Sequence, residues 1–551
     1  MSFCISVSRT RGGERRGRFL RFFSPVLAFM LMFCLALPLS AAAAEKPAYL
    51  KSVTYFGDQW PINFWSSEDD EMEANMARIA ADGFNSIILV VPWREFQPET
   101  DPVAYSDYPF KKLDAIMDCA ERHGLWVSLR VGYCWDYVGT SGVPARYTEI
   151  LKPESRARAA WLDYCRTLYA AASAHGNFYG GFITWEDFWD YTYSLEREIP
   201  ARERIQMAKD CGYTKYLEER YSIEQVSEAY GAGFSDFSQV YLPYKTHPSA
   251  SLFYDFYDEF LMNLMKESQA VFPELSMEVR VDGDVIYDGD GNQTYYSHGR
   301  TFACEGAPYS AIMYSVSMGQ ANNYERISAE QALSAMRTHL GNISAIAGGK
   351  PLFIEQLLYM DTTAEFSYNA QIEENQVDDY IMGLSPILKD YSNGYGLWVY
   401  RNYVNNCVYN AQFALGTKGW TASSGVRAES HDGSQAIALP SGESISQKLL
   451  KKFDRNDTVY VEFYAYSEAG ADMTVKVGDY ERVVRVSGPT RFVYSIPSTA
   501  DCVLSFTSDK GEVVIDDVKI YTYEQEGRIY DTDGSELDLA GAFRTLNGQL
   551  N

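Results

Sequence analysis

Two glutamates stand directly after short apolar segments that lie far apart in the chain. Glu186 follows the segment that ends at Trp185, and Glu355 follows the segment that ends at Ile354. If these segments are strands of a parallel barrel, the two carboxylates reach its C-terminal rim, where barrel enzymes carry their catalytic groups. A carboxylate pair of this kind can cleave a glycosidic bond, with one group protonating the leaving oxygen and the other attacking the anomeric carbon or activating water. The pair therefore predicts acid–base chemistry on a sugar.

Other carboxylates compete with Glu186 and Glu355 for these roles. Asp187 adjoins Glu186, and because neighbouring residues of a strand point to opposite faces, only one of the two enters the cleft. Glu278 and Glu305, near the fifth and sixth predicted strands, are weaker alternatives.

The position after Ile354 depends on the strand register. Counted from Pro351, Gln356 takes the nucleophile's place instead of Glu355. We prefer Glu355, because a carboxylate kept near other acids at a barrel mouth is costly unless it has a task.

The elements that must position these groups alternate between strand and helix. Helical patterns cover residues 68–81, 111–122, 154–174 and 329–346, and additional helix is expected within 190–250. Short apolar runs between helices are typical of parallel strands buried on both faces. The fold class is therefore α/β, with a (β/α)8 TIM barrel over residues 45–406. Its eight predicted strands are residues 50–56, 86–91, 126–131, 181–185, 276–281, 311–315, 352–354 and 395–400.

After about residue 406 the pattern changes to short alternating strands separated by Gly and Asp turns. This pattern predicts an all-β jelly-roll sandwich over residues 407–523, followed by a polar C-terminal tail over 524–551 that we leave unassigned. The sandwich resembles carbohydrate-binding modules, and a purely structural role for it is the alternative.

Residues 1–44 predict a signal peptide, because six arginines precede an apolar run and a string of alanines. An uncleaved N-terminal anchor is the alternative. Cleavage removes the six arginines and one glutamate, so the net charge changes from −26 to −31. Such a chain repels nucleic acid and anionic membranes. We expect a secreted or periplasmic protein, not bound to a membrane after cleavage, with a neutral carbohydrate as its partner. The oligomeric state is unknown.

Metal and cofactor motifs are weak. Six histidines and the absence of an HExxH sequence speak against a catalytic zinc site. Residues 288–292 (DGDGN) alternate oxygen-bearing side chains, but Gln293 and Gly299 stand where an EF-hand needs Gly and Glu. The seven cysteines beyond residue 44 form no CxxC pair. We expect no metal and no cofactor.

Several segments resemble retaining glycoside hydrolases of the large (α/β)8 clan. Residues 83–87 (GFNSI) and 91–99 (VPWREFQPE) are similar to that clan's second strand and loop. Residues 216–224 (YLEERYSIE) and 229–231 (AYG), with Phe234 and residues 242–243, resemble the microbial β-galactosidases of family 42, as does the pair Glu355–Gln356. The resemblance covers about residues 50–403.

This resemblance implies that Glu186 is the acid/base, Glu355 the nucleophile and Trp398 the floor of the sugar subsite. Trp185 stands where the clan has an asparagine that holds the sugar 2-hydroxyl. Position suggests that Tyr314 hydrogen-bonds the nucleophile and that Arg130 or Arg280 keeps it ionised. The candidate substrate-binding residues are Trp398, Tyr314, Trp185, Trp93, Trp60, Trp135, Arg130 and Arg280.

These observations favour a secreted retaining glycoside hydrolase that cleaves O-glycosidic bonds in a neutral oligo- or polysaccharide. The alternative is a non-catalytic glycan-binding protein on a degenerate barrel, for example in polysaccharide export. The departure at Trp185 and the register after Ile354 keep that alternative open.

Overall fold

The computed structural model describes residues 45–550 apart from several gaps, and almost all of them form one compact unit over residues 46–551. The gaps are residues 70, 134–144, 153, 185–198, 245–246, 280–284, 288–292, 317–323, 360–369, 432, 451–452, 500 and 526. Among the described residues, no helix combines the length and the apolar character needed to cross a bilayer.

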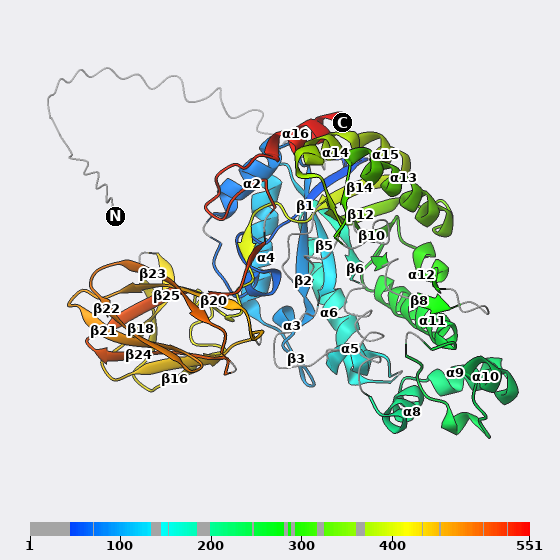
Figure 1. The fold of residues 1–551 in the computed structure, drawn as a ribbon, viewed down its shortest axis with the longest axis horizontal. Coiled ribbons are helices and arrows are strands. Elements are labelled where there is room, and N and C mark those ends of the chain that lie inside the picture. Colours follow the sequence, from blue (N-terminus) through cyan, green and yellow to red (C-terminus); the bar gives the residue numbers. More distant parts are fainter. Residues whose placement is uncertain are drawn as a thin grey trace, which may run out of the picture. The chain divides into compact units, whose positions relative to one another are not determined.

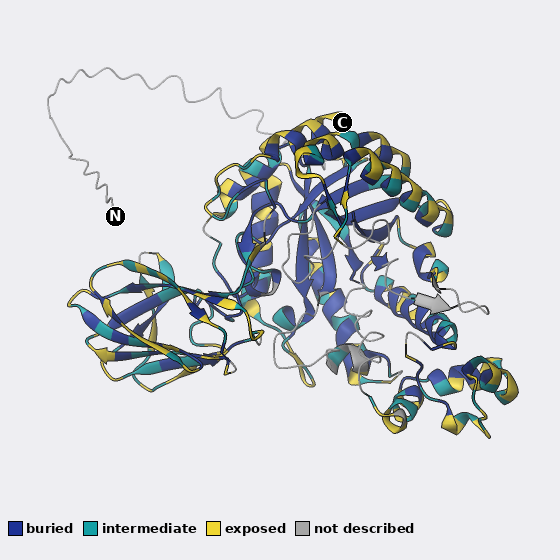
Figure 2. Cartoon of the chain, viewed as in Figure 1, coloured by how far each residue is buried: buried dark blue, intermediate teal, exposed yellow. Residues whose placement is uncertain are grey.

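A closed barrel of eight parallel strands forms the centre of this unit (Figure 1). Its strands are β1 (Leu50–Thr54), β2 (Ser86–Pro92), β5 (Trp126–Tyr133), β6 (Phe178–Ile183), β7 (Ser276–Val279), β10 (Ser310–Ser315), β12 (Leu352–Leu358) and β14 (Ser392–Leu397). All eight predicted strands are confirmed, although β14 begins at Ser392 and not at residue 395. The strands are buried on both faces, as Figure 2 shows, which explains why the sequence presents them as short apolar runs.

Helices surround the barrel and cover the outward side chains of its strands. They include α2 (Met72–Ala81), α4 (Asp107–Arg122), α6 (Arg156–Ala172), α11 (Ala250–Gln269), α13 (Ala329–Ile346), α14 (Val377–Gly383) and α15 (Ser385–Tyr391). Between β6 and α11 the described residues form three further α-helices, namely α8 (Ala201–Asp210), α9 (Tyr213–Arg220) and α10 (Ile223–Tyr230). They confirm the extra helix predicted there, and α10 begins with a capping box between Ser222 and Gln225.

Two antiparallel five-stranded sheets follow the barrel strands, in the orders β16-β19-β24-β21-β22 and β17-β18-β25-β20-β23. Their strands run from β16 (Thr421–Ala422) to β25 (Val513–Tyr521), and one apolar cluster contains residues of both sheets. The rings of Phe463, from β20 (Thr458–Tyr466), and Phe506, from β24 (Val503–Lys510), lie 5.2 Å apart in that cluster. The two sheets therefore share a core, and the alternation that predicted them places its apolar members inside.

The segment predicted as a polar tail instead returns to the barrel and ends in α16 (Ala540–Gln549). Asn547 is fully buried, accepts a hydrogen bond from the Tyr395 hydroxyl at 2.6 Å and donates to the backbone oxygen of Asp82 at 2.9 Å. Figure 1 shows α16, in red, next to α14, and contacts join the two helices. The helix thus lies between α14 and the end of α2, the place of the helix that follows the last strand of a (β/α)8 barrel.

The sandwich is therefore an insertion between β14 and the helix that completes the barrel. Its entry and exit lie side by side, because β15 (Tyr403–Val404) pairs antiparallel with β26 (Glu524–Gln525).

Candidate active site

Inward-pointing side chains of the barrel strands form two layers of different chemistry. The lower layer is an apolar plug near the N-terminal ends of the strands, made of Leu50, Ile88, Phe182, Tyr309, Ala311 and Phe353. Because side chains alternate along each strand, the next inward positions lie closer to the C-terminal ends. There the chain places Arg130 on β5, Glu278 on β7 and Glu355 on β12.

Arg130 and Glu278 form an ion pair across the barrel interior. Arg130 Nη2 lies 2.9 Å from Glu278 Oε2, with exposed fractions of 2% and 0% for the two side chains. The hydroxyl of Thr184, which follows β6, donates to the same carboxylate oxygen at 2.9 Å and accepts from Arg130 Nη2 at 3.1 Å. A charge this deeply buried is tolerated only with partners of this kind.

Arg130 also reaches the strand that carries the predicted nucleophile. Its Nη1 lies 4.0 Å from Glu355 Oε2 and donates to Gln356 Oε1 at 3.4 Å. The pairing of β12 shifts register between Ile354 and Leu357, so a bulge occupies this point of the strand. Glu355 and Gln356 therefore both lie within reach of the arginine, and Glu355 as the nucleophile stays a prediction.

Backbone packing beneath Glu355 depends on a glycine of β14. A Cβ atom at Gly396 would lie 2.5 Å from the backbone oxygen of Glu355, which is too close for any side chain. Gly396 thus allows β14 and β12 to approach at the level of the candidate nucleophile.

Aromatic side chains gather where β1 and β14 end. The ring of Trp398 lies 5.4 Å from that of Phe56 and 6.3 Å from that of Trp60, and the Trp60 and Tyr403 rings are 5.5 Å apart. Trp60 and Trp398 are half-buried, whereas Phe56 and Tyr403 are buried beneath them. The backbone N–H of Trp398 donates to the backbone oxygen of Leu357 at 3.4 Å, so this aromatic wall adjoins the strand of Glu355.

Trp93 does not belong to this wall, which corrects its prediction as a sugar-binding residue. Its side chain is fully buried at the start of α3 (Trp93–Phe96), and its ring lies 5.2 Å from that of Trp161 on α6. Its Nε1 donates to Gln97 Oε1 at 2.8 Å. Trp93 packs the end of β2 against α6 and presents no surface to a ligand.

Tyr314 is a second correction. On β10 the side chains of Ala311, Met313 and Ser315 point into the barrel. Tyr314 stands between two of these positions, so alternation turns its side chain outward. Its ring is fully buried 5.8 Å from that of His339 on α13, and its hydroxyl shares a hydrogen bond with Tyr380 on α14. The structure does not bring Tyr314 to Glu355.

The remaining predicted positions divide into two groups. Glu305 is exposed before β10, at the end of the barrel opposite the polar layer. Outside the described residues lie Glu186, Trp185, Trp135, Arg280, the competing Asp187 and the loop at 288–292.

Sequence reasoning missed Thr184 and gave Glu278 too little weight. Both interrupt otherwise apolar strand sequences at inward positions, and so does Arg130, whose neighbours Leu129 and Val131 face the outer core. A polar residue in the inward phase of an apolar strand is the signal that identifies this layer.

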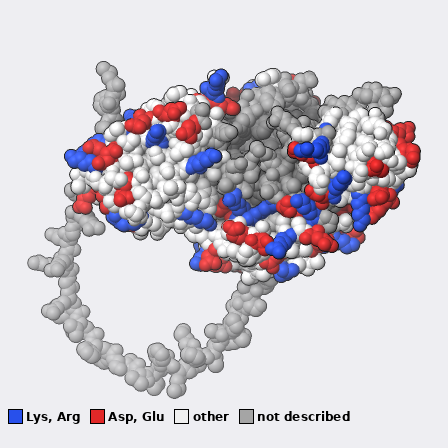
Figure 3. All heavy atoms as spheres, turned by 90° about the horizontal axis from the view of Figure 1, so that it is seen from below, with Lys and Arg blue, Asp and Glu red and all other residues white. Residues whose placement is uncertain are grey.

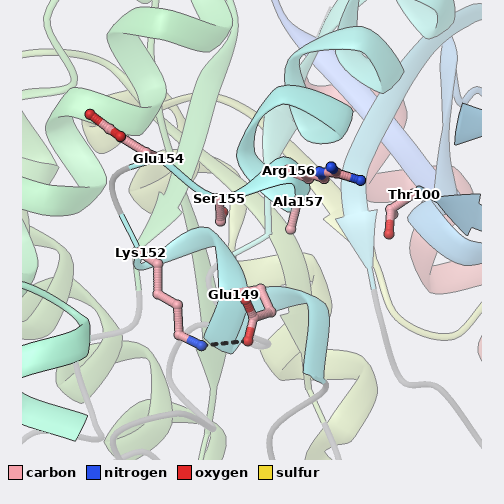
Figure 4. Close-up of a pocket in the computed structure, with 7 residues that line it drawn as sticks. All are labelled: Thr100, Glu149, Lys152, Glu154, Ser155, Arg156 and Ala157. Atoms are coloured by element: carbon pink, nitrogen blue, oxygen red, sulfur yellow. Dashed lines mark hydrogen bonds and ion pairs between the residues drawn. The ribbon is translucent and has the colours of Figure 1, made fainter. Parts of the chain in front are cut away.

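A hollow lies elsewhere on the surface (Figure 4). It has a volume of about 710 Å³ and is lined by Thr100, Glu149, Lys152 and residues 154–157. Lys152 and Glu149 form an ion pair of 2.6 Å there. Because its described lining contains no aromatic ring and none of the polar layer, we assign the candidate active site to the barrel interior.

No protein-family model matches the chain, and no curated protein matches it by sequence. Solved barrel structures resemble it weakly. The exo-β-1,4-mannosidase Op5Man5 from Opitutaceae bacterium strain TAV5 is 12% identical with a TM-score of 0.39, over 64% of this chain and 52% of that one. This chain therefore spans about half the length of that mannosidase.

Two further solved structures have similar values. A GH5_18 variant from Streptomyces cattleya in complex with Manβ1-4GlcNAc is 14% identical with a TM-score of 0.40, over 65% of this chain and 72% of that one. The β-galactosidase from the psychrophilic Marinomonas ef1 is 12% identical with a TM-score of 0.44, over 64% and 54%.

Proposed function

We propose that this protein is a retaining glycoside hydrolase whose nucleophile is Glu355. One observation carries the proposal: the Glu355 carboxylate lies inside a (β/α)8 barrel, at the middle residue of its strand, with the Arg130 guanidinium 4.0 Å away. A nearby cation favours the ionised form of a carboxylate, which is the form that attacks an anomeric carbon. The aromatic wall of Trp60 and Trp398 adjoins the strand that carries Glu355, and in this proposal it receives the apolar face of a sugar.

Glu186 is the proposed acid/base. In the sequence it comes two residues after Thr184, whose side chain reaches the Arg130–Glu278 pair. In the proposed reaction Glu355 attacks the anomeric carbon and the glycosidic C–O bond breaks, while Glu186 gives its proton to the leaving oxygen. Glu186 then takes a proton from water, which attacks the same carbon and releases Glu355.

Arg130 and Glu278 act as positioning residues in this proposal. Glu278 and Thr184 fix one side of the guanidinium, so that Nη1 is directed toward Glu355 and Gln356. A guanidinium held in this way stabilises the carboxylate without having to reorganise during the reaction.

A neutral oligo- or polysaccharide is the proposed substrate. The chain carries a net charge of −26, and in the view of Figure 3 basic and acidic side chains are intermixed over the described surface. Such a surface offers little attraction to an anionic polymer. We further propose that residues 1–44 direct export, to the periplasm or out of the cell, and that the sandwich is a jelly-roll module that binds glycan.

A fluorosugar that traps the glycosyl-enzyme tests the proposal. After a screen of neutral glycosides identifies a hydrolysed substrate, its 2-fluoro analogue should inactivate the enzyme and label the peptide that contains Glu355. Label on a peptide with Glu278 would move the nucleophile to β7. Turnover without any trapped intermediate, together with inverted product stereochemistry, would contradict the retaining mechanism.

A non-catalytic glycan-binding protein is the second candidate, and one observation favours it. Glu355 is only 1% exposed, and the closer ion pair of Arg130 is with Glu278. A binding protein would hold neutral glycans without turnover, and Glu355→Gln would leave its affinity unchanged.

A further inference from the structure

Three metal-ligating side chains meet on the outer surface of the barrel, away from the polar layer. Cys119 and His123 stand four residues apart at the end of α4, so they share one face of that helix. Glu73, in the first turn of α2, faces them. Figure 1 shows α2 and α4 next to each other, and contacts join the two helices.

The distances among the three side chains are close to those of ligands around one ion. His123 Nε2 lies 2.8 Å from Glu73 Oε1, and Cys119 Sγ lies 3.2 Å from Glu73 Oε2. One ligand atom from each residue lies within 4.8 Å of the other two. Zinc bonds of about 2.0–2.3 Å in a tetrahedron separate their ligand atoms by roughly 3.3–3.8 Å. A small opening of the present hydrogen bonds is enough to admit the ion.

We propose that Glu73, Cys119 and His123 form a binding site for Zn²⁺ that links α2 to α4, with water as the fourth ligand. A thiolate, an imidazole and a carboxylate are typical ligands of this borderline-soft cation. Mg²⁺ and Ca²⁺ prefer ligand sets made of oxygen atoms alone. Binding releases the proton of the Cys119 thiol to solvent as the Zn–S bond forms.

Two charges around the site act in opposite directions. The C-terminal end of α4, where His123 is the capping residue, carries the negative end of the helix dipole and favours a cation. Arg122 Nη2 lies 2.8 Å from Glu73 Oε2 and competes with a metal for that oxygen. The arginine is 58% exposed, so it can swing into solvent when an ion binds.

The proposed zinc site is structural: it cross-links α2 to α4 and has no part in the proposed glycosidase reaction. Its ligands lie on surface helices, whereas Arg130 and Glu355 lie inside the barrel. Zinc should therefore raise the thermal midpoint of the protein and leave glycan turnover unchanged.

Cobalt and zinc titrations test the proposal on the chelator-treated protein. Co²⁺ should produce a sulfur-to-metal charge-transfer band together with the visible bands of a tetrahedral ion, and Zn²⁺ should abolish both. Calorimetry should give one zinc site. Absence of a charge-transfer band, with no calorimetric binding of Zn²⁺, would overturn the proposal.

Single substitutions assign the ligands. Cys119→Ser should remove the charge-transfer band, and His123→Ala should weaken Zn²⁺ binding at least about tenfold. Arg122→Gln should tighten binding, because it removes the competing cation while leaving every ligand in place. Because Cys119 is buried, the Arg122 and His123 variants keep the test decisive if Cys119→Ser does not fold.

His175→Ala is the matched control. His175 contacts Asp114 at 3.0 Å and Asp118 at 3.2 Å on the same helix, but has no cysteine beside it. This variant should bind Zn²⁺ as the unmodified protein does. Loss of binding in His175→Ala with retention in Cys119→Ser would place the ion elsewhere and contradict the assignment.

Discussion

Arg130 and Glu278 form an ion pair of 2.9 Å at a depth in the barrel where neither side chain meets solvent. Within the described part of the polar layer, this pair organises the other groups, because the same guanidinium extends to Glu355 and Gln356. Its formation is thus a condition for the ionised nucleophile that we propose.

Breaking this pair from one side should cost more stability than replacing both partners. Glu278→Gln leaves the Arg130 guanidinium buried with a weaker partner, and such a loss costs about 3–5 kcal/mol. Arg130→Met combined with Glu278→Leu should cost less than Glu278→Gln, since neither member of the pair is left alone and the Glu355 carboxylate, which loses its cation, can take up a proton. The free energy of unfolding in urea measures both. Equal costs for the single and double variants would mean that the barrel hydrates the site when a partner is lost.

Glu355→Gln should abolish glycan hydrolysis, with kcat lowered by about 10⁴-fold or more, because an amide cannot attack the anomeric carbon. The matched control is Glu305→Gln, an exposed position at the other end of the barrel, which should keep full activity. Steady-state kinetics on the best glycoside of the screen measures both. Residual hydrolysis by Glu355→Gln within tenfold of the unmodified rate would remove Glu355 from the mechanism.

Trp398→Ala should raise KM for a glycoside by about fivefold while the protein remains folded, since loss of one stacking ring removes about 1 kcal/mol of sugar contact. Trp420→Phe is the control, because Trp420 packs in the core of the sandwich and not on the aromatic wall. Initial-rate measurements over a range of substrate concentrations separate KM from kcat. An unchanged KM for Trp398→Ala would show that the wall does not contact the substrate.

The barrel strands could be predicted because each is an apolar run flanked by helical patterns, and burial on both faces requires that composition. The direction of single side chains could not be predicted, because a shift of one residue reverses the face. Tyr314 turned outward for this reason. At Glu355 and Gln356 a bulge interrupts the alternation of inward and outward side chains. Counting residues along the strand therefore could not decide which of the two points into the barrel.

The sequence also could not predict that the chain returns from the sandwich to the barrel and ends there in α16. Residues 524–539 are mostly polar, and α16 contributes only a few apolar residues, among them Phe543 and Leu546, to the barrel core. Asn547 of this helix contacts Tyr395, 152 positions earlier, and Asp82, 465 positions earlier, and no local pattern records contacts so distant. Trp93 was misassigned because a tryptophan beyond a strand end has the same sequence signature whether it packs or binds.

Stability should fall as the pH rises from 4 to 7, through Asp516 in the sandwich. Burial is the main cause that raises the pKa of its carboxyl from 3.8 to about 7, and the nearby Asp517 and Glu68 act in the same direction. The folded protein therefore holds a proton that the unfolded chain releases near its ordinary pKa. Its stabilising contribution is complete below pH 3.8 and is lost by about pH 7.

Asp516→Asn should remove this dependence and raise the free energy of unfolding at pH 8 by about 2 kcal/mol, after allowance for solvent screening. Urea unfolding at pH 5 and pH 8 measures the difference between the variant and the unmodified protein. Asp501→Asn, an exposed position of the same sandwich, should leave the dependence intact. A variant with the same loss of stability between the two pH values would mean that another group carries it.

Two neighbouring positions of α16 should respond in opposite directions if this helix completes the barrel. Asn547→Ala removes the acceptor of the buried Tyr395 hydroxyl and the donor to the Asp82 backbone oxygen, which should cost about 2–4 kcal/mol. Gly548→Ala adds a methyl group where nothing lies within 4 Å, and it should stabilise the helix by about 0.5–1 kcal/mol. Urea unfolding followed by the fluorescence of the barrel tryptophans measures both. If α16 were instead a detached tail, Asn547→Ala would leave the barrel transition where it is, and the barrel would need another element to cover β1 and β14.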